Sequence, residues 1–99
     1  NKKIFEDNLA KAEAGDARMQ YNIHKYYLRG SGVKKDEQKA IEWLTKSADN
    51  GSRDAQYYLG VYYHLGKYGL KADKEKARKY LQKASDQGHT AAPVILDIL

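Results

Sequence analysis

Gly51-Ser-Arg-Asp-Ala-Gln-Tyr-Tyr-Leu-Gly-Val-Tyr-Tyr-His-Leu-Gly66 repeats a pattern that occurs earlier in the chain as Gly15-Asp-Ala-Arg-Met-Gln-Tyr-Asn-Ile-His-Lys-Tyr-Tyr-Leu-Arg-Gly30. The residues that recur 36 positions later are Gln20, Tyr21, Tyr26, Tyr27 and Gly30. Beyond a loop the match continues at a spacing of 37, through Asp36, Lys39, Ala40, Leu44 and Lys46. The second copy therefore carries one extra residue in its loop. Repeats of this length are typical of stacked helical hairpins.

Apolar residues within each copy are spaced by three and four positions, as on one face of a helix. We expect helices at residues 3–14, 16–29, 36–50, 53–65, 73–87 and from 90 onward. Candidate N-cap residues, whose side-chain oxygens accept the free amides of a first turn, are Asp16, Asp36, Ser52, Asp73 and Thr90. Gly51 and Gly88 follow the second helix of each copy, where a left-handed residue often ends a helix.

These helices predict an all-α fold, an α/α solenoid of antiparallel helix-turn-helix repeats in one domain. Its expected parts are a preceding half-repeat helix at 3–14, repeat one at 15–50, repeat two at 51–87 and a truncated third repeat at 88–99. The ends of such a stack need polar caps, yet the last segment is apolar on more than one side. We expect either further repeats in a longer protein or docking of this end, including self-association through the C-terminal helix. The first residue is Asn, so we expect a piece of a longer protein or a chain whose leader was removed.

Composition narrows the function only modestly. The formal net charge is +5, and no stretch approaches the roughly 20 apolar residues of a membrane helix. The chain has no cysteine, which excludes disulfides, thiolate zinc sites and a cysteine nucleophile. The positive charge leaves a basic nucleic-acid-binding helical domain as an alternative, although a solvated lysine-rich surface is the simpler interpretation.

No constellation of residues predicts an enzyme, a metal site or a cofactor. His24, His64 and His89 lack the spacing of a helical metal site. The acidic residues occupy cap positions or are scattered among lysines, and no acid-base pair stands out. The loop at 30–35 is rich in glycine and lysine, as phosphate-binding loops are. No strand precedes it and it recurs in altered form, so we interpret it as a connector.

Nine tyrosines stand against one phenylalanine, and most lie on the first helix of a copy. Recurrence favours packing, so we expect Tyr27 and Tyr63 in the core. For Tyr21 and Tyr57 both packing and partner binding remain open, because aromatic rings also anchor interfaces. Trp43 is expected to pack between repeats.

Three motifs connect the chain to a known family. They are Gly-x-x-x-Ala-Gln-Tyr-x-Leu-Gly-x-x-Tyr at 51–63, Gly-x-Gly-Val-x-x-Asp at 30–36 and Ala-x-x-Trp-Leu-x-x-Ser-Ala-x-x-Gly at 40–51. Across 14–92 the chain resembles the Sel-one-like repeats (SLR), relatives of the tetratricopeptide repeats. The first copy departs from the pattern at His24, where the second has Gly60; this predicts looser packing or an outward side chain.

The resemblance implies a right-handed superhelix that acts as a protein–protein interaction module, an adaptor or scaffold without catalytic activity. Its first helices would line a concave face that binds a protein or peptide. Carried over from the tetratricopeptide repeats position by position, the groove candidates are Arg18, Tyr21, Lys25, Leu28, Arg29, Asp54, Tyr57, Val61, His64 and Leu65.

Overall fold

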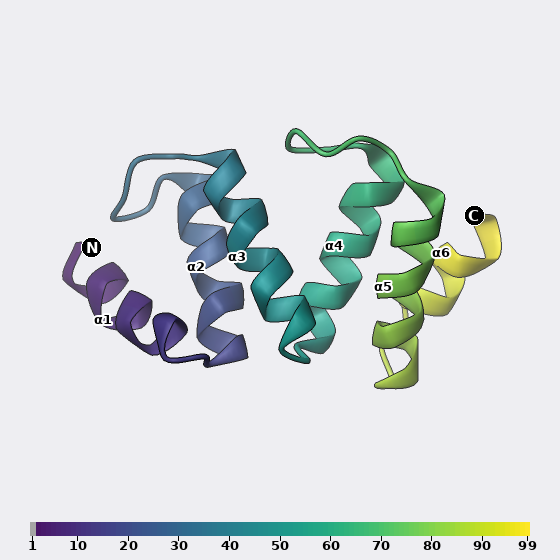
Figure 1. Ribbon diagram of the computed structural model, residues 1–99, viewed down its shortest axis with the longest axis horizontal. Coiled ribbons are helices and arrows are strands. Elements are labelled where there is room, and N and C mark those ends of the chain that lie inside the picture. The colour runs from purple at the N-terminus through teal and green to yellow at the C-terminus, as the bar shows by residue number, and fades with distance from the viewer. Residues whose placement is uncertain (1) are drawn as a thin grey trace.

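The computed structural model describes residues 2–99, and in that range the chain forms α-helices and no strand. The helices are α1 (Lys2–Glu13), α2 (Ala17–Arg29), α3 (Glu37–Asp49), α4 (Arg53–Leu65), α5 (Lys74–Asp86) and α6 (Ala92–Ile98). They follow one another along an elongated body with extents of 42 × 25 × 17 Å (Figure 1). The predicted all-α solenoid is confirmed.

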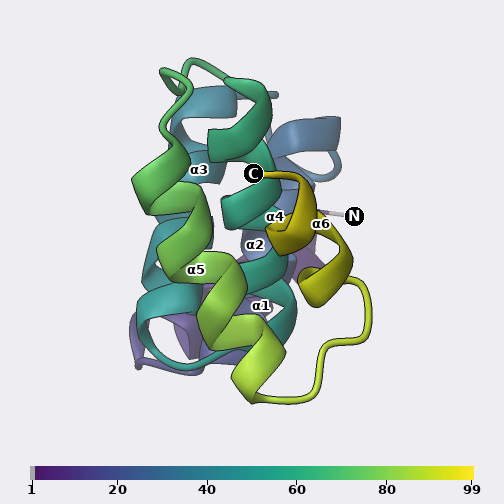
Figure 2. The same cartoon turned by 90° about the vertical axis from the view of Figure 1, so that its right-hand side faces the viewer.

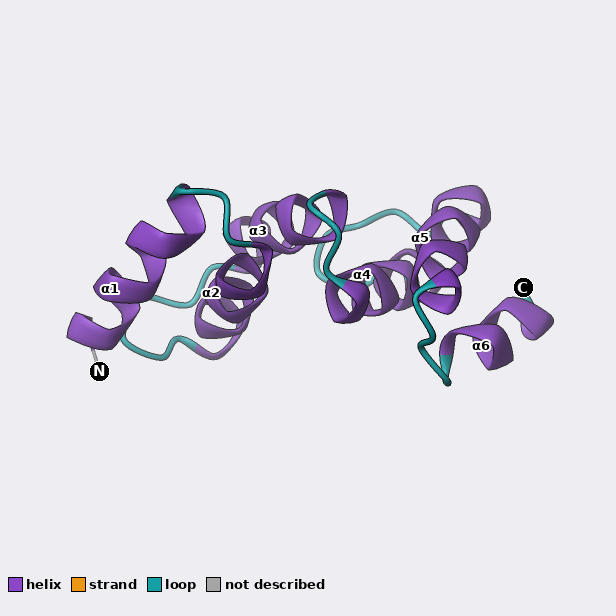
Figure 3. Ribbon diagram, turned by 90° about the horizontal axis from the view of Figure 1, so that it is seen from below, coloured by secondary structure: helices purple, strands orange, loops and turns teal. Residues whose placement is uncertain are grey.

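The helices alternate between two sides of the stack. Seen from below, α1, α3 and α5 lie along one side and α2, α4 and α6 along the other (Figure 3). Along the long axis, α5 and α6 end the stack in front of the earlier helices (Figure 2). The first helices of successive repeats, α2 and α4, are therefore neighbours on one face.

Side-chain caps start four of these helices where the sequence predicts. Asp16, Asp36, Ser52 and Asp73 each accept a hydrogen bond from the backbone amide three residues later. The prediction for Thr90 is wrong. Helix α6 begins at Ala92 without a side-chain cap, and the acceptor in this turn is Nδ1 of His89, 3.2 Å from the amide of Ala91.

The core runs along the stack as clusters that join successive helices. One cluster holds α1 to α2 and α3 through Phe5, Ala12, Ile23, Tyr27 and Ala40. The middle cluster joins α3, α4 and α5 through Ile41, Leu44, Ala48, Ala55, Leu59 and Tyr80. The last one joins α5 to α6 through Ala77, Leu81, Ala84 and Ala92. Each repeat thus buries its apolar face against a neighbour.

Tyrosine packing follows the prediction in repeat one and partly in repeat two. Tyr27 is buried, with 8% of its surface exposed. Tyr63 is only partly buried, where it packs against both the middle and the last cluster and stacks parallel to Tyr80. Trp43 is also partly buried and packs between repeats, against the cluster of α1, α2 and α3, as expected.

Gly60 and His24 occupy equivalent positions in the two repeats, but their surroundings are packed differently. A Cβ on Gly60 would lie 2.6 Å from Cγ of Leu81, so glycine permits the close approach of α4 to α5. The expectation of an outward side chain at His24 is wrong, because only 2% of this residue is exposed. Its imidazole lines a hollow between α2 and α4, and Nδ1 donates a hydrogen bond to the carbonyl oxygen of Tyr21. The ring is therefore accommodated between the two first helices.

Candidate protein interface

A hollow of about 280 Å³ lies between the first helices of the two repeats. The residues that line it are Tyr21, His24, Lys25, Leu28 and Arg29 from α2, with Tyr58 and Tyr62 from α4. A second hollow, of about 570 Å³, opens where α2 and α4 begin. Its lining includes Ala17, Arg18, Tyr21, Asn22, Asn50, Gly51, Ser52 and Asp54. Both hollows border Tyr21, and we refer to the two together as the α2–α4 groove.

The structure brings part of the predicted binding set together in this groove. Its members there are Arg18, Tyr21, Lys25, Leu28, Arg29 and Asp54. The other four candidates belong to α4 and lie outside the groove lining. Tyr57 and Val61 pack against the cluster next to α6, and Tyr57 stacks on His89 with ring centroids 4.1 Å apart. His64 is partly buried and Leu65 is 56% exposed at the end of α4. A binding role stays a prediction for all ten.

Sequence reasoning missed eight residues of the groove lining, which are Ala17, Asn22, His24, Asn50, Gly51, Ser52, Tyr58 and Tyr62. The rule taken from tetratricopeptide repeats selects one stripe on each first helix. The residues of α4 that turn back toward α2 lie one position further along the helix than that stripe. Tyr58 differs between the copies, with Asn22 as its counterpart, and this difference was the available signal.

Aromatic rings form a connected layer on the groove wall. Tyr21 stacks on Tyr58 at 6.1 Å between centroids, Tyr58 lies 6.2 Å from Tyr62, and Tyr62 meets Tyr68 edge-on at 4.8 Å. The ammonium group of Lys25 sits 4.8 Å from the centre of the Tyr21 ring. These contacts hold the rings in place before any partner arrives.

Burial raises the pKa of two groove tyrosines, Tyr21 and Tyr62. It raises the pKa of Tyr21 to about 12, with smaller contributions from Tyr58 and Asp54. Burial also raises the pKa of Tyr62 to about 12, helped by Tyr68 and Tyr58. Both hydroxyls are therefore neutral at ordinary pH and able to donate a hydrogen bond.

His24 is uncharged at neutral pH for the same reason. Burial lowers its pKa to about 4, and the nearby cations Lys25 and Arg29 add to this effect against the opposing hydrogen bond to Tyr21. The positive charge of the groove is therefore carried by its arginine and lysine side chains.

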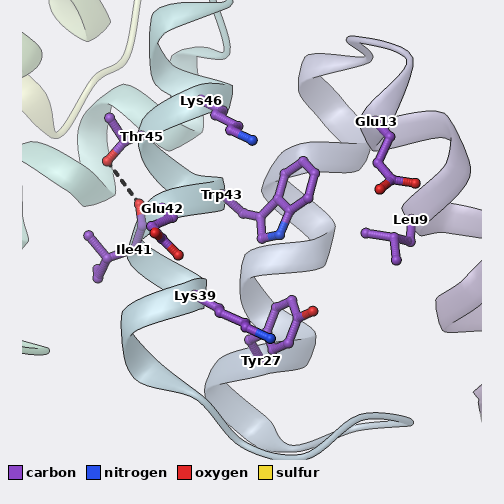
Figure 4. A pocket seen from close by; sticks show the side chains of 9 residues that line it. All are labelled: Leu9, Glu13, Tyr27, Lys39, Ile41, Glu42, Trp43, Thr45 and Lys46. Atoms are coloured by element: carbon purple, nitrogen blue, oxygen red, sulfur yellow. Dashed lines mark hydrogen bonds between the residues drawn. The ribbon is translucent and has the colours of Figure 1, made fainter.

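Another hollow of about 570 Å³ lies between α1 and α3, on the side of the second helices. Figure 4 shows Trp43 and Tyr27 facing Leu9 and Glu13 across it, with Lys39 and Lys46 nearby. The ammonium group of Lys46 is 4.5 Å from the Trp43 ring centre. Its cations and carboxylates balance, so its lining favours no ligand charge.

At the position equivalent to Trp43, the next repeat has Tyr80. The hydroxyl of Tyr80 donates a hydrogen bond to Oδ1 of Asp49 at 3.1 Å. Tyr80 is 7% exposed, in contrast to the partly exposed Trp43. The hollow between α1 and α3 therefore reflects a difference in sequence between the copies.

Among residues 2–99, no group of three or more histidine, aspartate or glutamate side chains is placed to hold a metal ion. Nor is any helix in this part of the chain long and apolar enough to cross a membrane.

A family model for the Sel1 repeat matches residues 17–52 and 53–89. The chain belongs to the Sel1 repeat family. This confirms the resemblance to Sel-one-like repeats. Sel1 repeats generally act as protein-interaction modules and non-catalytic scaffolds.

Solved Sel1 repeat structures share the fold. A Sel1 repeat protein from Oxalobacter formigenes is 30% identical with a TM-score of 0.87, covering 92% of this chain and 68% of the other. A protective antigen of uropathogenic Escherichia coli with an SLR fold is 31% identical, with a TM-score of 0.86, over 95% and 20% of the two chains. Cysteine rich protein B of Helicobacter pylori is 29% identical with a TM-score of 0.88, over 97% and 72%.

A curated relative is a sel1-like repeat-containing protein of Acanthamoeba polyphaga mimivirus, 50% identical over 42 residues. The match covers 42% of this chain and 7% of the viral protein. The chain thus corresponds to a small part of that relative.

Proposed function

We propose that this Sel1 repeat domain is an adaptor or scaffold. It binds a peptide or surface segment of a protein partner in the α2–α4 groove, on the concave face of the stack. The observation that carries the proposal is the accessible tyrosine layer flanked by arginine and lysine. Tyr58 is 39% exposed beside Arg29 and Lys25. Tyrosine and arginine are the residues most enriched among interface hot spots, because they combine large apolar contact with hydrogen bonding.

Two further features of the groove support a binding role. It lies between two helices that the core already holds in place, so little ordering of the backbone is needed when a partner binds. Several of its residues differ between the copies, with Arg18 against Asp54 and Lys25 against Val61. Residues that only maintain the repeat would be expected to recur.

Affinity capture with the chain immobilised, followed by mass spectrometry, tests the proposal. A specific partner should be recovered by the unmodified chain and lost with Tyr58→Ala combined with Arg29→Ala. Arg78→Ala, an exposed position on α5, is the matched control and should retain the partner. Recovery that is equal with the groove variant would refute the groove as the binding site.

We also propose self-association through α6. Val94 is 61% exposed and Ile98 66% exposed on this helix, whose partly buried residues pack on the last cluster. A second copy would remove these apolar side chains from water, which favours association.

A further inference from the structure

More positively than negatively charged side chains line the α2–α4 groove. Arg18, Lys25 and Arg29 line it, and Asp54 is its single acidic residue. That carboxylate is already 3.5 Å from the guanidinium of Arg53. The three cations therefore face the groove without a matching number of anions.

These cations form one stripe. An α-helix turns once every 3.6 residues, so positions 18, 25 and 29 of α2 lie within about 40° of each other around the axis. From Arg18 to Arg29 the stripe is about 16 Å long, because each residue rises about 1.5 Å. An extended peptide of about five residues spans the same length.

Tyrosine hydroxyls add further donors. Among residues 2–99, the hydroxyls of Tyr21, Tyr58 and Tyr62 have no hydrogen-bonding partner in the protein. Together with Lys25 and Arg29, they give the hollow around Tyr58 many donors, and no carboxylate lines that hollow. The complementary ligand is rich in acceptors and negatively charged.

The cationic stripe belongs to the first repeat alone. Its equivalents on α4 are Asp54, Val61 and Leu65, which are acidic or apolar. The repeat scaffold does not require cations at these positions, since the second copy folds without them. Their presence in one copy therefore points to a ligand.

The geometry favours a peptide over a nucleic acid. Bases bind by stacking on free aromatic faces. In the groove, Tyr21 is covered by Lys25 and by Tyr58, and Tyr62 is in contact with Tyr58 and Tyr68. The groove also contains the apolar side chain of Leu28, which suits a peptide side chain.

We propose that the α2–α4 groove selects an acidic, extended peptide segment. Its carboxylates lie near Arg18 and near Lys25 and Arg29, and an apolar side chain between them packs on the ring pair of Tyr21 and Tyr58. This inference rests on the proposed function, since it names the chemistry of the partner bound at the same site.

Fluorescence anisotropy with synthetic peptides tests it. The probe is a labelled peptide with glutamates at both ends of a leucine-containing centre, and its matched control has glutamine in place of every glutamate. We expect the acidic peptide to bind and the glutamine peptide to bind at least about tenfold more weakly, as expected when several charge pairs are lost. Equal binding of the two peptides would overturn the inference.

Variants of the protein test whether the three groove cations bind the acidic peptide. Changing Arg18, Lys25 and Arg29 each to glutamine should weaken binding about two- to fivefold per residue and about tenfold or more together. The control changes three exposed lysines outside the groove, Lys2, Lys34 and Lys74, to glutamine and removes the same charge. It should bind the acidic peptide nearly as well as the unmodified chain. An equal loss in the control would show general attraction between charges and refute the site.

Two outcomes separate this inference from the proposed function. If a captured partner is lost with Tyr58→Ala and Arg29→Ala together, but the acidic peptide shows no dependence on the three cations, the acidic specificity fails and the groove stands. If an oligonucleotide binds more tightly than the peptide at near-physiological salt and requires the same cations, a nucleic-acid site replaces both proposals.

Discussion

The side-chain amide of Gln56 donates a hydrogen bond to the carbonyl oxygen of Ala48 at 3.1 Å, which ties α4 to the last turn of α3. One repeat earlier, Gln20 makes the same bond to Ala12, at 3.0 Å. Each glutamine is 4% exposed, so both bonds are shielded from water. The glutamine thus caps the second helix of one repeat from the first helix of the next.

The glutamine is itself held by a further side chain. Oε1 of Gln56 accepts from Gln87 at 2.8 Å, and Oε1 of Gln20 accepts from Asn50 at 2.9 Å. The relay therefore spans three successive helices in each copy. This hydrogen-bond relay explains why a glutamine recurs at this position in both repeats.

Gln56→Leu is expected to lower the free energy of unfolding by about 1–3 kcal/mol, because the carbonyl of Ala48 loses its buried hydrogen-bond donor. Urea unfolding followed by circular dichroism measures it. Gln38→Leu, at an exposed position on α3, is the control and should change stability by less than about 0.5 kcal/mol. Similar losses in the two variants would contradict the relay.

Gly60→Ala is expected to destabilise the chain although alanine is the better helix former. Its Cβ would lie 2.6 Å from Cγ of Leu81 and 3.1 Å from the carbonyl oxygen of Ala77. Overpacking costs about 1–3 kcal/mol, whereas the gain in helix propensity is about 1 kcal/mol. We expect a lower melting temperature for the variant.

A double-mutant cycle with Leu81→Ala identifies the cause. Shortening Leu81 removes its Cγ and Cδ2 atoms but leaves the carbonyl oxygen of Ala77 at 3.1 Å, so adding Gly60→Ala in that background should cost less than in the unmodified chain. If Gly60→Ala destabilises equally in both backgrounds, the close contact with Leu81 is not the reason.

His24 predicts a pH dependence of stability. Because its pKa falls to about 4 in the folded chain, against about 6.5 when unfolded, the unfolded state binds more protons between these values. The contribution of neutral, buried His24 to the free energy of unfolding is therefore complete above about pH 6.5, and it is lost as the pH falls toward 4. The loss approaches about 3 kcal/mol at the lower end.

The measurement compares the unmodified chain with His24→Asn, which keeps an amide donor near the position of Nδ1 but does not titrate. Urea unfolding between pH 7 and pH 4 should show a shallower loss of stability in the variant. Carboxylates titrate in both proteins, so the difference between the two curves reports His24. Parallel curves would show that the imidazole is not desolvated in solution.

Local signals explain how much of this fold the sequence predicts. Helix periodicity and the caps at Asp16 and Ser52 depend on residues a few positions apart, which a single sequence displays. The cap at Thr90 failed because a competing acceptor, His89, lies in the same turn. The packing of His24 depends on the space between α2 and α4, which no local pattern encodes.

The sequence rule selected five residues of α2 that line the groove, but from α4 it selected only Asp54 of the lining residues. The rule taken from the tetratricopeptide repeats considers one helix at a time, and it selected residues of α2 such as Arg29. Tyr58 and Tyr62 contribute through the relative rotation of α4 against α2, which is a property of the packed stack. Tyr57, a groove candidate for which packing also remained open, packs against the last cluster, because α6 follows α4 as α4 follows α2.

Self-association through α6 gives the final prediction. Ile98 and Ile4 are exposed to similar extents, 66% and 54%, at opposite ends of the stack. Sedimentation velocity of the unmodified chain should show a sedimentation coefficient that rises with concentration, because α6 buries its apolar side chains against a second copy. Ile98→Lys should abolish the rise, since a lysine in the contact would have to lose its hydration. Ile4→Lys adds the same charge at the other end and should leave association intact. A rise that survives Ile98→Lys but disappears with Ile4→Lys would place the contact on α1 instead.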